Sequence, residues 1–362
     1  MIPWIFQHFR DLLPGATVFR YVTFRAALAA ATAFLLSLLL GPLVIRTLKR
    51  LKMGQHIREE GPQHHQSKAG TPTMGGILVL LVILLSTLLW CDLKSGAIWV
   101  ALMALLGFGC VGAFDDAQKL LKRQNLGLRS WQKMLLLTVI SLVVGGLILH
   151  FGLRGQATSQ LSMPFFKNFR PDVGIFLLPW IWLVMVGTSN AVNLTDGLDG
   201  LAIGGMLVVA LTFALLAYVA GHARMANYLF VPFVPGGAEL TVFMGAMAGA
   251  SLGFLWFNAH PAEVFMGDTG SLGLGGALGA VALMIKQELL LVIAGGVFVL
   301  EAVSVILQVG SYKLRGGKRI FRMAPFHHHL ELGGLKETKV VIRLWITAIV
   351  CSILALSSLK LR

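Results

Sequence analysis

Five aspartates are the residues of this 362-residue chain whose placement suggests chemistry, because each lies in a short polar stretch beside long apolar runs. They are Asp115, Asp116, Asp196, Asp199 and Asp268. Carboxylates concentrated beside a membrane are costly unless a cation neutralises them. Since these stretches offer oxygen ligands without Cys or metal-spaced His, we expect the cation to be Mg²⁺, with Mn²⁺ as the alternative.

The stretch Thr188–Gly200, TSNAVNLTDGLDG, is the centre of this pattern. It holds two of the five aspartates and two asparagines, and it has no Lys or Arg. Asn190 and Asn193 offer uncharged donors and acceptors of the kind that contact a base or a sugar. A plainer interpretation is also open, in which Asp199 caps the next helix and Asp196 forms an Asx turn.

The other three aspartates also have plain alternatives. Asp115 and Asp116, in GAFDDAQK, could be a solvated helix end balanced by Lys119 and Lys122. Because neighbouring helical residues point about 100° apart, we expect this pair to divide two roles. Asp268, in MGDTGS, could be no more than a Gly-flanked turn. It is the convergence of the motifs that favours a functional site.

Three further features suggest contacts with a phosphorylated ligand. Lys68 precedes the loop GTPTMGG, where backbone N–H groups could meet phosphate, although the Walker spacing is missing. Phe265 is a loop aromatic that could stack on a nucleobase or anchor the membrane interface. His327, His328 and His329 diverge on regular backbone, so phosphate contact or hydrogen bonding within the loop is favoured over a zinc site.

Apolar helices must position these residues, because 56% of the chain is hydrophobic, only 13% is charged and the mean hydropathy is +0.79. Apolar runs of membrane-spanning length recur from end to end. We predict a single all-α polytopic membrane domain over 1–362, with residues 1–20 as an interfacial segment. Its ten predicted transmembrane helices are Phe24–Ile45, Thr73–Trp90, Ala97–Phe114, Trp131–Phe151, Val173–Val186, Leu201–Ala220, Leu240–Trp256, Ser271–Ile285, Leu289–Val309 and Val340–Leu359.

Two of these spans, Val173–Val186 and Ser271–Ile285, are shorter than the hydrocarbon core of a bilayer. Short spans would let a polar cavity dip below the headgroups beside the aspartates. Glu301 lies inside the ninth span, and an intramembrane acid is a candidate for function. A purely structural role, with a hydrogen bond to a neighbouring helix, is equally open for Glu301.

Basic residues are distributed unevenly among the loops. Of the 30 Lys and Arg, 19 follow the first, third and ninth spans. By the positive-inside rule these loops, including a basic and His-rich loop over 310–339, face the cytoplasm and both termini are periplasmic. The five aspartates then lie near the cytoplasmic surface. Topology therefore accounts for the net charge of +14, and we expect no nucleic-acid partner.

Together, acidic metal ligands, basic loops and a membrane surface favour metal-dependent phosphoryl transfer from a nucleotide-type donor to a lipid. A cation transporter would also place acids in its spans, but we see no convincing internal repeat. A structural membrane protein without catalysis would not need acids concentrated in loops that lack basic residues.

Five motifs carry a specific resemblance that spans the whole chain. GTPTMGG at 70–76, GAFDDAQK at 112–119, NAVNLTDGLDG at 190–200, FNAHPAEVFMGDTGSL at 257–272 and RMAPFHHHLELGG at 322–334 resemble the phospho-N-acetylmuramoyl-pentapeptide transferases (lipid I synthases). These belong to the superfamily of polyprenyl-phosphate N-acetylhexosamine-1-phosphate transferases. The His triplet favours this family over the related N-acetylglucosamine-1-phosphate transferases, which remain the alternative.

The resemblance implies a bacterial inner-membrane enzyme, typically a homodimer. It would transfer phospho-N-acetylmuramoyl-pentapeptide from its UDP carrier to undecaprenyl phosphate with Mg²⁺, giving lipid I and UMP. It also implies that Asp268 is the metal ligand and that Asp115 and Asp116 lie at the catalytic centre. The substrate-binding residues that it implies are Lys68, Asn190, Asn193, Asp196, Asp199, Asn258, Phe265, His327, His328 and His329.

Overall fold

The fold is known from a computed structural model, which describes residues 2, 16–51, 70–121, 127–152, 159–166 and 169–360. Lys68 and most of the predicted interfacial segment lie outside the described residues. All of the regular elements in the described part are helices, and it contains isolated β-bridge residues, such as the pair Gln160 and Asp172, but no strand. The prediction of an all-α protein is therefore confirmed for the part of the chain that the structure describes.

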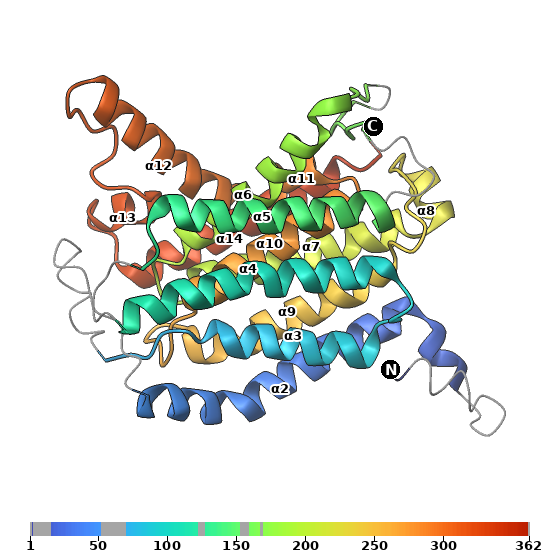
Figure 1. The fold of residues 1–362 in the computed structure, drawn as a ribbon, viewed down its shortest axis with the longest axis horizontal. Coiled ribbons are helices and arrows are strands. Elements are labelled where there is room, and N and C mark those ends of the chain that lie inside the picture. Colours follow the sequence, from blue (N-terminus) through green and yellow to red (C-terminus); the bar gives the residue numbers. More distant parts are fainter. Residues whose placement is uncertain are drawn as a thin grey trace.

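The helices run back and forth along one direction (Figure 1). The long helices are α2 (Val22–Arg50), α3 (Gly76–Trp90), α4 (Gly96–Leu121), α5 (Ser130–Leu147), α6 (Leu177–Thr195), α7 (Leu201–Ala220), α9 (Glu239–Asn258), α10 (Gly267–Met284), α12 (Gly296–Leu314) and α14 (Glu337–Ser357). The short ones are η1 (Ala16–Arg20), η3 (Ile148–Gly152), η4 (Gly174–Phe176), α8 (Ala223–Tyr228), α11 (Glu288–Ala294) and α13 (Phe326–Glu331). Within the described residues, eight helices are long and apolar enough to cross a membrane.

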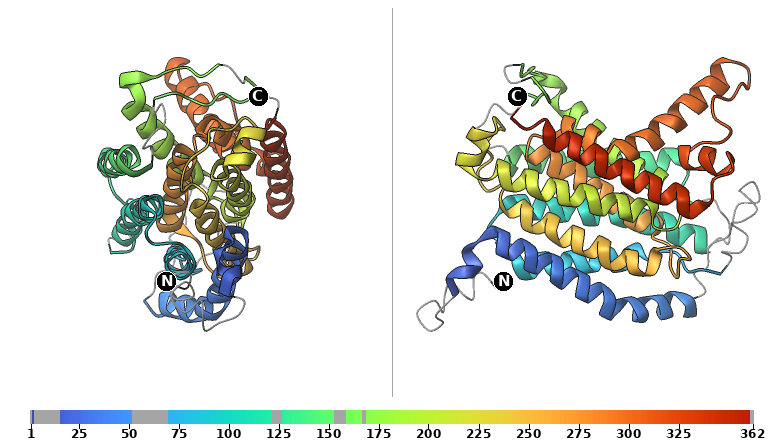
Figure 2. Two further views of the ribbon diagram at one scale, coloured as in Figure 1. Left: turned by 90° about the vertical axis from the view of Figure 1, so that its right-hand side faces the viewer. Right: turned by 180° about the vertical axis from the view of Figure 1, so that it is seen from behind.

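Helix α10 forms the centre of the bundle, where it packs against α4 and α6 (Figure 2). All of its residues from Thr269 to Met284 are buried. Five of those residues are glycines, which let neighbouring backbones approach closely, as is common where membrane helices pack. Helix α9 joins a second group, with α2 and α7 on either side of it.

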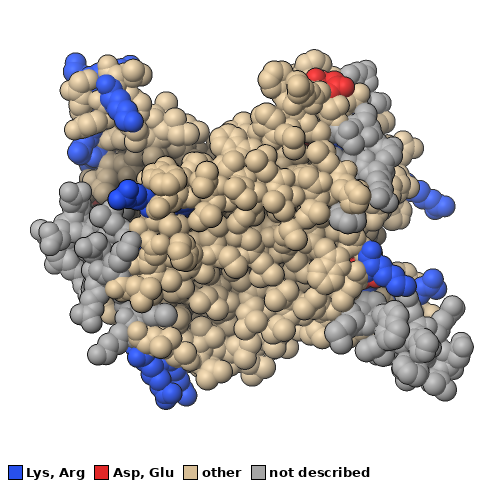
Figure 3. Space-filling model, in the orientation of Figure 1, with Lys and Arg blue, Asp and Glu red and all other residues tan. Residues whose placement is uncertain are grey.

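The bundle is apolar between two charged ends. Figure 3 shows a broad surface without charged residues, and the visible Lys and Arg side chains gather at the two ends of the helices. The start of α2 and the end of α14 lie at one end, and α13 lies at the other (Figures 1 and 2). A surface of this kind is suited to a bilayer, with the helices spanning it.

The two spans that were predicted to be short are longer than predicted. Helix α6 continues to Thr195 and α10 begins at Gly267, so these helices have 19 and 18 residues. Their polar residues are accommodated inside the bundle: Asn190 donates to the carbonyl of Val186 one turn earlier, at 2.8 Å, and Asn193 bonds across to α10. A polar side chain with a partner does not have to end a helix.

Two other boundaries differ from the prediction. Helix α4 continues to Leu121, so the paired aspartates lie within the helix and not at its end. The predicted ninth span is divided at Gly295 into α11 and α12. Gly295 caps both helices, and α12 then tilts away from the bundle (Figure 1).

Candidate active site

Three of the five aspartates meet at the α13 end of the bundle. Asp115 and Asp116 come from α4 and Asp268 comes from the first turn of α10, and one oxygen of each lies within 4.8 Å of the others. The approach depends on Gly112, since a Cβ at this position would collide with the carbonyl of Asp268. The prediction that these distant motifs converge is confirmed for the three.

The two neighbouring aspartates have different surroundings. Asp116 accepts hydrogen bonds at the same oxygen, Oδ2, from the backbone N–H of Thr269 at 2.9 Å and from its hydroxyl at 2.8 Å. Asp115 Oδ1 accepts from the backbone N–H of Leu128, at 2.6 Å. Both side chains are almost completely buried. This difference fits the expectation that the pair divides two roles, which itself stays a prediction.

Two lysines stand among the carboxylates. Lys119 Nζ lies 2.7 Å from Asp115 Oδ2 and 3.0 Å from Asp268 Oδ2. Lys133, from α5, places its ammonium 2.7 Å from Asp268 Oδ2. Lys119 was expected as a counter-charge of the paired aspartates, whereas the contact of Lys133 with Asp268 was not predicted. The i,i+4 spacing predicts the contact of Lys119 with Asp115, whereas no local signal predicts that of Lys133.

Helix α6 adds polar groups from the central stretch. Asn193 donates to Asp268 Oδ1 at 2.8 Å and lies 2.9 Å from the hydroxyl of Ser271. Asp196, just after α6, accepts a hydrogen bond from the backbone of Gly267. Removal from water, with the negative charges of Asp268 and Asp116 nearby, raises the pKa of Asp196 to about 8. The site therefore concentrates more negative charge than its two lysines balance.

The described part of the Gly/Thr/Pro-rich loop borders the same site. The N–H of Phe265 donates to the carbonyl of Pro72, and the N–H of Gly75 donates to that of Phe265, both at 2.8 Å. The next pair, from Gly76 to Met266, continues the contact at 2.8 Å. These bonds fix the backbone of the half-buried Phe265, which lies two residues before the start of α10.

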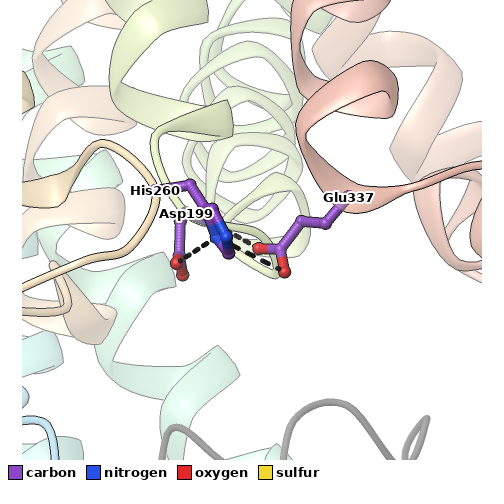
Figure 4. Close-up of side chains that lie close together, drawn as sticks. All are labelled: Asp199, His260 and Glu337. Atoms are coloured by element: carbon purple, nitrogen blue, oxygen red, sulfur yellow. Dashed lines mark hydrogen bonds and ion pairs between the residues drawn. The ribbon is translucent and has the colours of Figure 1, made fainter.

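Asp199 belongs to a second group, shown in Figure 4. Its Oδ2 lies 3.1 Å from Nδ1 of His260 and accepts from the backbone N–H of Ala262. Glu337, at the start of α14, accepts the backbone N–H of Asp199 and approaches His260 to 3.8 Å. This group joins three segments, and of its members only Asp199 was predicted as a site residue. The alternative in which Asp199 caps the next helix is wrong, because Gly200 occupies the N-cap of α7.

Asn258, at the end of α9, connects the loop after α6 to the loop before α10. Its amide donates to the carbonyl of Val264 at 2.8 Å, and its oxygen accepts from the N–H of Gly200 at 3.1 Å. Both ends of this buried amide therefore bond to backbone. The arrangement gives Asn258 a positioning role for the loop after α6, beside the substrate contact that the resemblance implies.

The three histidines of α13 have different hydrogen-bond partners, but the predicted divergence does not hold for two of them, because the ring centroids of His327 and His328 lie only 4.2 Å apart. His327 is buried against Glu301 of α12, and His328 lies 2.9 Å from Glu331. His329 accepts the backbone N–H of Arg322 at 3.1 Å. The expectation against a zinc site at these histidines stays a prediction.

The site formed by Asp115, Asp116 and Asp268 has the chemistry of a divalent-cation site. Three carboxylates supply hard oxygen ligands, and Asn193 and Ser271 stand beside them. Such a donor set suits a hard divalent cation better than zinc, which prefers Cys and His. The residues present therefore fit a divalent metal.

Comparisons with known proteins agree with this geometry. The family model "Glycosyl transferase family 4" matches residues 98–286, more than half of the chain, and a phospho-N-acetylmuramoyl-pentapeptide-transferase signature matches residues 68–80. The first range contains α4, α6 and the start of α10, which together supply the acidic cluster and Asn193.

Several curated relatives match almost end to end. The phospho-N-acetylmuramoyl-pentapeptide-transferase of Solidesulfovibrio magneticus is 56% identical over 100% of this chain and 99% of its own length. The enzyme of that name from Desulfotalea psychrophila is 55% identical over 96% of both chains, and that from Koribacter versatilis is 50% identical over 100% of both. The chain therefore belongs to the phospho-N-acetylmuramoyl-pentapeptide-transferase family and is a transferase enzyme.

Proposed function

We propose that this enzyme transfers phospho-N-acetylmuramoyl-pentapeptide from its UDP carrier to undecaprenyl phosphate, giving lipid I and UMP. The names of the full-length relatives support this donor. The observation that carries the proposal is the meeting of Asp115, Asp116 and Asp268 inside the range that the family model matches. A lipid acceptor agrees with a site at one end of an apolar bundle.

The proposal places the enzyme in the bacterial inner membrane, with ten spans, both termini periplasmic and the site facing the cytoplasm. The eight long apolar helices, together with the shorter apolar α3 and the buried α10, support this count. The start of α2 and the end of α14 lie at the same end of the bundle, which supports an even number of membrane crossings. We further propose a homodimer, as the family resemblance implies.

Mg²⁺ is the proposed metal, held by Asp268 with Asp115 and Asp116, where it would offset the charge of the donor diphosphate. A phosphate monoester has a second pKa of about 6, so the lipid phosphate is largely dianionic at neutral pH and needs little help from a base. We propose that its oxygen attacks the β-phosphorus in line while the bond to the UMP oxygen breaks. Lys119 and Lys133 offset charge, and Asp115 orients the acceptor.

A covalent intermediate on Asp116 is the rival mechanism. The nucleophilic oxygen would have to be free to reach phosphorus, yet Asp116 Oδ2 is held by two hydrogen bonds from Thr269. Its other oxygen lies 3.5 Å from the ammonium of Lys119. These contacts favour direct transfer. Isolation of a phospho-enzyme formed without lipid would overturn that preference.

The substrate is proposed to occupy the ring of loops around this cluster. The proposed nucleotide and diphosphate contacts are Lys68, Asn190, Asn193, Asp196, Asp199, Asn258 and Phe265. The three histidines His327, His328 and His329 are proposed to help hold the sugar-diphosphate. The positions of the helix ends support this assignment, since the end of α6, the start of α10 and the short helix α13 all lie at the same end of the bundle (Figure 1).

The proposal is tested by the variant Asp268→Asn. It keeps the size of the side chain but removes the charge that meets both lysines, so turnover should fall by about a hundredfold or more while the protein still folds. Asp172→Asn, at an exposed site distant from the cluster, is the matched control and should retain wild-type turnover. A folded Asp268→Asn protein with wild-type turnover would contradict the proposal.

A further inference from the structure

Glu301 and His327 form a buried pair, and the proposed mechanism gives Glu301 no role. Glu301 lies in α12 and His327 in α13, and their side chains are 0% and 1% exposed. Glu301 Oε2 accepts the backbone N–H of His327 at 3.3 Å and lies 3.1 Å from its ring nitrogen Nδ1. Among the described residues no Lys or Arg forms an ion pair with Glu301.

The number of titratable hydrogens shared by the Glu301 carboxyl and the His327 ring decides whether Nε2 carries a hydrogen. If the pair holds two titratable hydrogens, it is neutral overall, whether as carboxylate and imidazolium or as carboxylic acid and imidazole. In both forms Nδ1 is engaged with Glu301 and the other nitrogen, Nε2, carries a hydrogen. If the pair holds one, a net negative charge is buried without a cation, which is costly. Burial therefore favours a hydrogen on Nε2.

That nitrogen faces the central polar loop. A Cβ placed on Gly197 would collide with Nε2, so only glycine leaves room for the ring there. Nε2 is buried and has no hydrogen-bond partner among the described residues. The same is true of the second carboxylate oxygen of Glu301, Oε1. The neighbouring residue is Asp196, whose pKa already responds to the charges of Asp268 and Asp116. The unpartnered nitrogen therefore lies against the loop that carries Asp196.

We propose that Glu301 is a positioning residue that keeps Nε2 of His327 hydrogenated, so that this N–H donates to a phosphate oxygen of the nucleoside diphosphate donor. A pair that only tied α12 to α13 would need no hydrogen on Nε2 and no glycine in front of it. The proposal rests on the proposed function for the identity of the ligand. The state of the ring does not depend on it.

The state of the ring is tested first, by ¹⁵N NMR of the protein labelled in histidine. The resonances of His327 are identified by their loss in His327→Gln. Nε2 should carry a hydrogen in the wild type and none in Glu301→Gln, whose amide oxygen would face the backbone N–H and Nδ1–H of His327. A wild-type Nε2 without a hydrogen would overturn the proposal even if the enzyme transferred the expected donor.

The role is then tested by kinetics. Glu301→Gln should raise the KM for the nucleotide donor by roughly 10- to 100-fold, the effect of losing one hydrogen bond to a charged group, and leave the KM for the lipid phosphate unchanged. Because Glu301 acts through His327, the double variant should be no worse than His327→Gln alone. Additive losses, or an equal change in both KM values, would contradict the proposal.

Ser304→Ala is the matched control. Its buried hydroxyl donates to the backbone carbonyl of Glu301 at 2.7 Å on the same helix and forms no hydrogen bond with the side chains of the pair. This variant should keep both the ring state and the donor KM. If no donor is turned over at all, the NMR result still decides the pair, so failure of this inference and failure of the proposed function are distinguished.

Discussion

Asp268 is the residue on which the contacts of the acidic cluster converge. Its Oδ2 meets two ammonium groups, from Lys119 at 3.0 Å and Lys133 at 2.7 Å, and its Oδ1 accepts from Asn193. A divalent cation bound to this carboxylate would be repelled by the two ammonium groups that contact the same oxygen. Binding of metal and placement of the lysines are therefore coupled.

This coupling predicts the effect of Lys133→Met on metal binding to the substrate-free protein. Removing one positive charge beside the carboxylates should tighten binding of Mn²⁺, measured by electron paramagnetic resonance, by about tenfold or more. Turnover should fall, because the same ammonium is proposed to face the diphosphate. Lys94→Met, which removes an exposed lysine far from the cluster, should change neither quantity. Unchanged or weaker Mn²⁺ binding would refute the coupling.

Asp196 gives a prediction about pH. Removal from water raises its pKa to about 8, well above the usual value of 3.8. A raised carboxyl pKa contributes stability that is complete below the unfolded value and is lost as pH rises through the folded value. Without metal, the melting temperature should therefore decline between pH of about 4 and 8 more steeply in the wild type than in Asp196→Asn. Parallel profiles of the two proteins would show that Asp196 is ordinarily ionised.

At the scale of elements, close packing of α3, α4 and α10 creates the site. Gly112 of α4 contacts the backbone at Asp268, and Gly76 of α3 contacts that at Gly270. No side chain larger than a hydrogen fits at either contact. The carboxylates therefore meet because the helices that carry them touch backbone to backbone.

Gly112→Ala should separate α4 from α10. The added methyl group is expected to cost about 1–3 kcal/mol of stability, typical of overpacking, and to lower turnover by tenfold or more. Gly146→Ala on α5, whose added methyl would meet open space, should leave turnover unchanged. Melting temperature and turnover measured on both variants check this. Equal turnover in the two would show that the packing contact does not set the geometry of the site.

The helices were predictable from the sequence, and their ends were less so. Apolar runs gave an element for each of the ten predicted spans, because hydrophobicity alone decides which segments can be buried in lipid. Asn190 and Asn193 ended the predicted span too early, since their partners on α6 and α10 are visible only in three dimensions. The break at Gly295 coincides with the Gly295–Gly296 pair, which the prediction kept within one continuous apolar run.

At the scale of the whole molecule, the site is assembled from segments far apart in the chain. Asp115, Asp116 and Asp268 could be predicted together, because acids beside apolar helices demand a common cation. Lys133 and the partner of Glu301 could not, because they depend on which helices become neighbours. Topology set by the basic loops, with both ends of the chain on one side of the membrane, stays a prediction.

The central claim is the transfer reaction, and UMP release by the purified enzyme tests it most directly. The protein would be supplied with undecaprenyl phosphate and Mg²⁺, and UDP-N-acetylmuramoyl-pentapeptide would be compared with UDP-N-acetylglucosamine as donor, each with and without a chelator. We expect UMP from the pentapeptide donor only, and none after chelation. Release from UDP-N-acetylglucosamine alone, or from neither donor by a folded protein, would contradict the account.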